Sequence, residues 1–228
     1  IDASDLTFGT NGFYQKYAST ELADSIVDSS IAGGRTQALF TVTDYEDVVT
    51  KTDEKKVGTA SAKFDGTNDY LSIPKNIAFA FGEDRSDFTI ECWFRWNGRS
   101  NRDDWSSLLG MGVDDDNALI FGHIPGGTVT EGEVGFRYRT GAIGDQITIS
   151  SSTNIVQGEW AHLAVVRYGS LWTMWLDGVD VGNVTDTRLN YDLDTRVVIG
   201  KADPESPSGY NHFNGYIDEL RVSHGGSN

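Results

Sequence analysis

Hydrophobic and polar side chains alternate along several short segments of this chain. The clearest is residues 88–96, FTIECWFRW, in which every second residue is large and apolar. Residues 133–139, EVGFRYR, repeat the pattern. Because successive side chains of a β-strand point to opposite faces, a period of two predicts strands with one buried and one exposed face.

The same pattern predicts further strands, and glycine-containing turns separate them. The additional segments are residues 62–65, 69–73, 108–111, 118–121, 146–150, 162–167, 171–176, 197–199 and 216–222. Asp65-Gly66 and Asp177-Gly178 are typical of tight turns between antiparallel strands. Many short strands without a helical period beyond residue 60 predict an all-β antiparallel sandwich or barrel.

The first 57 residues have a weaker alternation and are rich in Ser, Thr, Asp and Gly. Residues 37–44 predict a strand, and residues 20–27 a short helical turn. We expect residues 1–57 to form an extended arm packed on the sandwich, or a connector to a preceding domain, and residues 58–228 to form the domain itself. The predicted core contains Phe64, Ile90, Phe94, Phe136, Val165 and Leu220.

Charge and composition exclude several classes of partner. The net charge is −16 over 228 residues, so the surface repels phosphate backbones and anionic lipid. No apolar run approaches the length of a membrane helix, and we expect neither nucleic-acid binding nor membrane insertion. The single cysteine, Cys92, excludes a disulfide within this sequence and a cysteine-based zinc site. The chain opens on Ile1, and we expect a longer protein around it.

Five motifs in order carry a family resemblance. They are FDGTNDYLSIP from residue 64, FTIECWF from 88, WAHLAVVR from 160, LWTMWLDG from 171, and IGKAD from 199 followed by FNGYIDELRVS from 213. Together they resemble the laminin-G-like branch of the concanavalin-A-like lectin/glucanase fold, over residues 58–224. The resemblance implies a jelly-roll sandwich of two antiparallel sheets, one convex and one concave.

The N-terminal segment has a resemblance of its own. The string LTFGTNGFYQKYASTELADS, from residue 6, is similar to segments that precede laminin-G-like domains in structural proteins of marine tailed phages, particularly those that infect cyanobacteria. This resemblance implies a virion location, other virion subunits as partners in a homo-oligomer, and a host cell-surface polysaccharide as ligand. A secreted or cell-surface location is the alternative.

Oxygen-bearing side chains suggest calcium as a candidate cofactor. Asp65, Asn68 and Asp69 lie in one tight turn, and closely spaced oxygen ligands suit Ca²⁺. Many relatives of the resembled family carry calcium, which implies Asp218 of the closing IDE segment as a further ligand. The alternative is that Asp65 caps the turn while Asp69 is solvated. A second acidic run, residues 114–117, is a weaker candidate because charge runs are usually solvated.

Sugar binding is the second candidate chemistry. Glu91, Trp93 and Arg95 share the outward face of one predicted strand, and we expect Arg137, Arg139, His162 and Trp175 to share the same sheet face. An aromatic ring among arginines on a concave sheet predicts a glycan groove, with acidic glycans suited to the arginines. The alternative is that the arm or a neighbouring subunit covers this face.

Catalytic motifs are missing from the sequence. Glucanases of the resembled fold use the pattern E-x-D-x-x-E, which does not occur; Glu91 has no second acid on its strand and is expected to pair with Arg95. Nucleophile-elbow and phosphate-loop patterns do not occur either. We therefore predict a non-enzymatic virion adhesion module that binds host glycans. The alternatives are a purely architectural virion subunit and a secreted bacterial carbohydrate-binding or carbohydrate-active domain.

Overall fold

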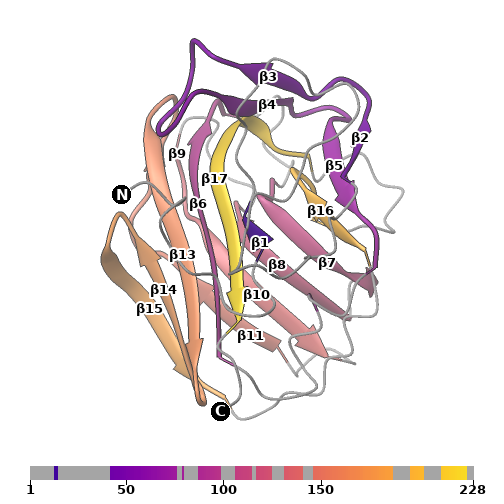
Figure 1. Cartoon of the computed structure of the whole chain (residues 1–228). Coiled ribbons are helices and arrows are strands. Elements are labelled where there is room, and N and C mark those ends of the chain that lie inside the picture. Colours follow the sequence, from indigo (N-terminus) through magenta and orange to yellow (C-terminus); the bar gives the residue numbers. More distant parts are fainter. Residues whose placement is uncertain are drawn as a thin grey trace, which may run out of the picture.

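Two antiparallel sheets lie face to face in the computed structural model of the chain (Figure 1). The structure describes residues 13–14, 42–75, 79, 87–98, 106–114, 117–124, 131–140, 146–186, 196–202 and 212–224. Statements below concern these residues.

The larger sheet has eight strands. Its order is β15 (Val179–Thr185), β14 (Leu171–Leu176), β13 (Trp160–Tyr168), β6 (Phe88–Trp96), β17 (Asn214–His224), β4 (Ser61–Asp65) and β3 (Val49–Lys51), with β1 (Phe13–Tyr14) also paired to β17. The last strand of the chain thus lies between β6 and β4, in the middle of the sheet. This position joins the two ends of the domain sequence by main-chain hydrogen bonds.

The second sheet has seven strands. Its order is β11 (Gln146–Ser150), β10 (Gly135–Thr140), β8 (Asn117–His123), β7 (Leu109–Asp114), β16 (Val197–Ile199), β5 (Tyr70–Ile73) and β2 (Thr43–Tyr45). A two-stranded ribbon of β9 (Glu131–Gly132) and β12 (Ile155–Val156) completes the described strands. Every described strand pairing is antiparallel, as the short glycine-containing connections predict.

The core fills the space between the sheets. Along β6 every second side chain is buried: Phe88, Ile90, Cys92, Phe94 and Trp96. All six predicted core residues are buried, and the prediction of an all-β two-sheet antiparallel sandwich is confirmed. Burial of apolar surface at about 25 cal/mol per Å² makes this interface the main favourable term in folding.

The Asp177-Gly178 turn between β14 and β15 has the predicted geometry. Asp177 has φ 50° and Gly178 has φ 77°, the left-handed pair that a tight hairpin needs. The Asp177 N–H donates to the His162 carbonyl at 2.8 Å, which ties the turn to β13. The turn thus fixes the register that places β14 beside β13.

The expected boundary at residue 57 falls inside the sandwich. β2 pairs with β5 and β3 pairs with β4, so residues 43–51 are part of the two sheets. The predicted strand at 37–44 is described from residue 42 onward, and the predicted helical turn at 20–27 lies outside the described residues. Within the described part of the chain, no helix has the length and apolar character that crossing a membrane requires.

Candidate functional site

Five of the seven predicted sugar-binding residues lie on the outward face of the eight-stranded sheet. Trp93 on β6 pairs with His162 on β13, while Glu91 pairs with Ala164, which in turn pairs with Trp175 on β14. These two sets of cross-strand pairs are adjacent rows on the sheet face, because Glu91 and Trp93 are two positions apart on one strand. The register therefore brings Glu91, Trp93, His162 and Trp175 together, and Arg95 begins the next row.

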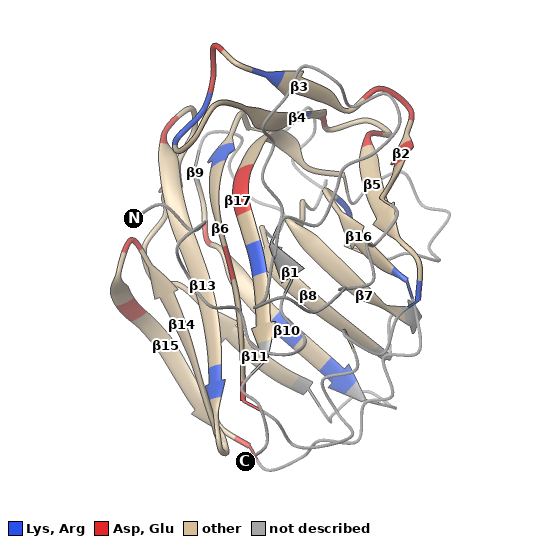
Figure 2. Cartoon of the chain, viewed as in Figure 1, with Lys and Arg blue, Asp and Glu red and all other residues tan. Residues whose placement is uncertain are grey.

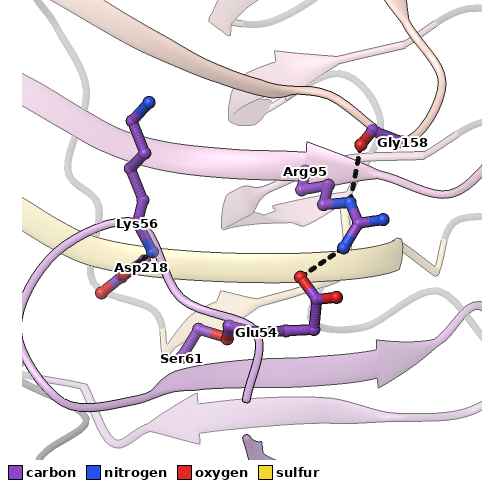
Figure 3. Close-up of polar contacts among 6 residues, drawn as sticks. All are labelled: Glu54, Lys56, Ser61, Arg95, Gly158 and Asp218. Atoms are coloured by element: carbon purple, nitrogen blue, oxygen red, sulfur yellow. Dashed lines mark hydrogen bonds and ion pairs between the residues drawn. The ribbon is translucent and has the colours of Figure 1, made fainter. Parts of the chain in front are cut away.

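A loop folds over one half of this face. We call residues 52–60, which connect β3 to β4, the strap (Figure 3). The backbone N–H groups of Lys56 and Val57 donate to one carboxylate oxygen of Asp218 on β17, at 2.8 and 2.9 Å. The Ser61 hydroxyl donates to the Glu54 carbonyl. These bonds hold the strap against β17, and Asp218 is 1% exposed.

Arg95 is occupied by partners within the chain. Its Nε donates to the Gly158 carbonyl at 2.7 Å, and its guanidinium forms an ion pair with Glu54 of the strap (Figure 3). The guanidinium carbon also lies 5.5 Å from the centre of the Tyr216 ring. The expected ion pair of Arg95 with Glu91 is wrong, because the strap supplies a closer carboxylate.

Trp93 is half-buried between neighbouring side chains. The Lys56 Nζ lies 4.5 Å from the centre of its ring, and the His162 ring centre lies 5.0 Å away. Trp93 and Arg95 therefore contact the strap in the part of the predicted glycan groove that they were expected to form. The alternative interpretation expected the arm or a neighbouring subunit as a cover. The cover is the strap, which straddles the boundary predicted between arm and domain.

Glu91 forms a polar network on the same face. It pairs with Arg221 of β17, and its second oxygen lies 3.4 Å from Nε2 of His162. Burial lowers the pKa of His162, and the nearby Asp177 carboxylate opposes that shift in part. At neutral pH the imidazole is therefore uncharged, with one nitrogen donor and one acceptor.

Among the described residues, no loop covers the β13–β15 side of the face. Trp175 is 37% exposed, and its cross-strand neighbour Ala164 is a small, buried side chain between Trp175 and Glu91. On the other side Trp175 pairs with Asp180 of β15, whose carboxylate accepts from the Gly182 N–H at 3.0 Å. We call Trp175, Ala164, Glu91, His162 and Asp180 the Trp175 patch.

The Trp175 patch combines an aromatic surface with planar polar groups. An exposed indole offers an apolar face for stacking, and the carboxylates and imidazole beside it accept or donate hydrogen bonds. Sequence reasoning missed Ala164 and Asp180. Asp180 lies three residues after the turn at Asp177, a signal that β15 passes next to Trp175.

Arg137 and Arg139 lie on the other sheet. They belong to β10, which pairs with β8 and β11 in the seven-stranded sheet, whereas β6, β13 and β14 belong to the eight-stranded sheet. The expectation that they share a face with Trp93 is wrong. Alternation tells which face of a strand is buried, but not to which sheet the strand belongs.

The turn that holds Asp65, Asn68 and Asp69 is organised by backbone hydrogen bonds. One Asp65 oxygen accepts from the N–H of Thr67 at 2.7 Å and of Asn68 at 3.3 Å. Asp69 accepts from the N–H of Asp47 and of Asp65. Burial raises the pKa of Asp69; it acts in the same direction on Asp65, but there the backbone donors outweigh it and lower the pKa. Asp65 therefore caps the turn, as the alternative interpretation expected, but Asp69 is buried and not solvated.

Asp218 does not join this turn. Asn214 pairs with Asp65, and Asp218 lies four residues further along β17, a distance of about 13 Å at the usual rise of a strand. The predicted four-residue calcium set does not fit this geometry. Among the described residues no three His, Cys, Asp or Glu side chains gather as metal ligands. Calcium at Asp65, Asn68 and Asp69 alone stays a prediction, and Asp115 and Asp116 lie outside the described residues.

Comparison with protein families decides the class of this domain. A family model described as "Concanavalin A-like lectin/glucanases superfamily", Laminin_G_3, matches residues 65–225. The chain belongs to this family. The match runs from the end of β4 to β17 and includes Glu91, His162 and Trp175. No curated protein matches the laminin-G-like chain in sequence.

Solved structures share the fold at low sequence identity. One is domain 4 of AbnA, an extracellular arabinanase of family GH43 from Geobacillus stearothermophilus, in complex with arabinotriose: TM-score 0.58, 17% identity, 82% of each chain covered. Another is the binding domain of Paraclostridial Mosquitocidal Protein 1: TM-score 0.66, 17% identity, 95% of this chain and 49% of that one.

A third similar structure belongs to botulinum neurotoxin type C, whose cell entry is dependent upon interaction with two ganglioside molecules. The TM-score is 0.62 at 11% identity, over 92% of this chain and 47% of that one. The laminin-G-like chain thus spans about half the length of these toxin chains. The mosquitocidal structure is a binding domain and the arabinanase domain holds arabinotriose, while the family description also includes glucanases.

Proposed function

We propose that this laminin-G-like domain binds carbohydrate without catalysing a reaction, and that its sugar contacts centre on Trp175. One observation carries the proposal: a tryptophan stands exposed on a sheet face, next to a small residue and flanked by Glu91, His162 and Asp180. A single exposed apolar side chain is common on protein surfaces, so the polar groups placed around this indole are what make it a candidate binding site.

The patch suits the two surfaces of a sugar ring. The C–H groups on one face of a pyranose or furanose stack on an aromatic ring, and the hydroxyl groups at the rim form hydrogen bonds. Ala164 is short enough to let a ring approach the indole from the side of β13. Glu91 and Asp180 then provide acceptors on both sides of Trp175, and the neutral His162 adds a further polar contact.

The comparisons support a binding domain of this kind. The arabinanase domain was solved with arabinotriose, and the neurotoxin interacts with gangliosides. Because the shared region is about half of the toxin chain, the gangliosides are not assigned to that half. The arabinanase is extracellular, which favours the secreted bacterial carbohydrate-binding domain over the virion module that the N-terminal string implied.

A virion location, assembly with other virion subunits and a purely architectural role stay predictions from the sequence. None of the three similar structures named above is a virion protein. An architectural subunit would use the exposed edge of β14 and β15, where Leu171 and Val179 are solvent-exposed, for contacts between copies. It would bind no glycan, and a binding experiment separates the two functions.

The experiment is a glycan array followed by titration of the strongest glycan. We expect a micromolar to millimolar interaction that Trp175→Ala weakens about ten- to a hundredfold, by analogy with aromatic stacking on nucleobases at ~1–3 kcal/mol. Tyr168→Ala is the matched control, because Tyr168 is an exposed aromatic residue on the adjacent strand, outside the patch. Binding that survives Trp175→Ala, or an array without any bound glycan, would contradict the proposal.

A further inference from the structure

The arginines in the strands that form the binding face are all engaged within the chain. The strands β6, β13, β14, β15 and β17 contain three arginines and no lysine. Arg95 pairs with Glu54, and Arg221 pairs with Glu91. Arg167 is buried, with its guanidinium 5.5 Å from the centre of the Trp172 ring.

The lysines of the strap are also engaged. The Lys56 Nζ lies over the Trp93 ring, and the Lys55 Nζ donates to the Thr52 carbonyl at 2.6 Å. A carboxylate or sulfate ligand would have to displace one of these internal contacts. Displacement is costly because the internal acid, such as Glu54, would then lose its own partner.

The charged groups around Trp175 are acidic. Glu91 lies in the same cross-strand row, Asp180 pairs with Trp175, and Asp177 lies in the turn between β14 and β15. Figure 2 shows red on β15 and in its turn with β14, and no blue on either strand. The net charge of −16 adds a long-range repulsion of anions.

From these contacts we infer that the Trp175 patch selects neutral sugars and rejects glycans that carry uronate or sulfate. The inference rests on the proposed function and names its substrate class. Carboxylates are acceptors, and the hydroxyl groups of a neutral sugar donate to them in charge-assisted hydrogen bonds. A uronate or sulfate in the same place meets the exposed carboxylates of Asp177 and Asp180, and Arg221, the arginine in the same cross-strand row, is already paired with Glu91. This reverses the preference for acidic glycans that the arginines suggested in the sequence.

The test uses the intact chain and pairs of polysaccharides that differ in charge alone. Polygalacturonate is compared with its carboxyl-reduced form, and chondroitin sulfate with desulfated, carboxyl-reduced chondroitin; debranched arabinan is a third neutral probe. Affinity electrophoresis at 50, 150 and 500 mM NaCl measures binding. We expect retardation by at least one neutral polymer, with an affinity that changes less than about twofold over this salt range, and no retardation by the charged forms.

Trp175→Ala in the same gels separates the proposed binding site from the inferred selectivity for neutral sugars. If a neutral polymer is bound and Trp175→Ala releases it, both claims stand. If a charged polymer is bound more tightly than its neutral form and Trp175→Ala releases it, the site stands and the inferred selectivity is overturned. If binding does not depend on Trp175, or no polymer is retarded, the proposed function is overturned and the selectivity with it.

Discussion

Two halves of one sheet face differ in what covers them. Over β17 and the end of β6, the strap closes the surface and occupies Asp218 and Arg95. Over β13, β14 and β15 no described loop covers the face, and Trp175 is exposed. Both halves have outward polar and aromatic side chains from the same kind of alternation. Whether polar groups of this face, such as Arg95 and Asp218, bond within the chain therefore depends on the strap and not on the strands.

The comparison of the two halves shows how a loop can occupy polar side chains so that they no longer face a ligand. Backbone N–H groups of the strap donate to the Asp218 carboxylate, and the Glu54 carboxylate of the strap accepts from Arg95. The covered residues therefore stabilise the domain. Among the described residues, no such loop covers Trp175 and Asp180. We therefore expect substitutions in the covered half to change stability, and substitutions in the open half to change binding.

The largest expected effect on stability is that of Asp218→Ala. It leaves the N–H groups of Lys56 and Val57 without their acceptor, and we expect the free energy of unfolding to fall by about 2–3 kcal/mol. Asp218→Asn keeps an acceptor oxygen and should lose about half as much. Urea denaturation measures both, with Asp180→Asn in the open half as the control. A loss below about 0.5 kcal/mol for Asp218→Ala, under the usual net worth of one hydrogen bond, would mean that the strap is not held by this carboxylate.

The pH dependence of stability tests the same carboxylate. Burial raises the pKa of Asp218 above its ordinary value of 3.8, despite the donors from Val57 and Lys56. Between 3.8 and the raised pKa the folded chain binds the proton more tightly than the unfolded chain, so stability increases as pH falls through this window. Asp44 and Asp69, whose pKa values are raised by burial, act in the same direction.

We therefore expect these three carboxyl groups to raise the melting temperature as pH falls from 7 to 4.5. His162 opposes them: burial lowers its pKa, so the unfolded chain binds this proton more tightly and stability falls as pH drops below the ordinary value of 6.5. Asp65, whose pKa is lowered, has the opposite effect on stability. Its stabilising contribution is present above pH 3.8 and is lost below that value as pH falls. Asp218→Asn should reduce the gain on acidification. Thermal melts of the chain and of Asp218→Asn between pH 7 and pH 4.5 measure it, and the same change in melting temperature for both proteins would be the contrary result.

A smaller effect is expected for Lys56→Ala. The contact of Lys56 with Trp93 is a partly exposed cation–π pair, worth ~0.5–1 kcal/mol. The variant should lose no more than that in urea denaturation, while the 19F signal of 5-fluorotryptophan at position 93 shifts and that at 175 does not. Shifts at both positions would show that the two halves of the face are not independent.

The smallest expected effect concerns calcium. The oxygens of Asp65 and Asp69 already accept backbone N–H groups, which leaves few free ligands in the turn. We expect stability in 2 mM calcium and in EDTA to differ by less than about 1 kcal/mol, which is less than the ~2.7 kcal/mol of a ligand at a hundredfold excess over its Kd. A larger shift that Asp65→Asn removes would show that an ion displaces these internal donors.

The sequence predicted most of the fold because alternation is a local signal. β6 and β13 have buried apolar residues in regular order, and their bounds match the predicted segments closely. β15 was missed because it is a polar edge strand, exposed along most of its length. β2 and β3 were assigned to the arm because three-residue strands are too short to show a period.

The site was predicted in part, and the errors have one cause. Alternation placed Glu91, Trp93 and Arg95 on the outward face correctly. It gave no information on which loop covers that face or on which sheet receives β10, since both depend on contacts between distant segments. The pairing of Arg95 with Glu54 joins residues 41 positions apart, and that of Asp218 with Lys56 joins residues 162 positions apart.

The most direct test of the division between covered and open halves compares Trp93→Phe with Trp175→Phe. Both substitutions keep an apolar ring on the same sheet face, but one lies under the strap and the other in the open patch. Isothermal titration with the strongest neutral glycan of the array, together with urea denaturation, measures affinity and stability. We expect Trp175→Phe to weaken binding several-fold with stability almost unchanged, and Trp93→Phe to lower stability with affinity almost unchanged. The reverse pattern, with affinity lost at Trp93 and kept at Trp175, would contradict this division.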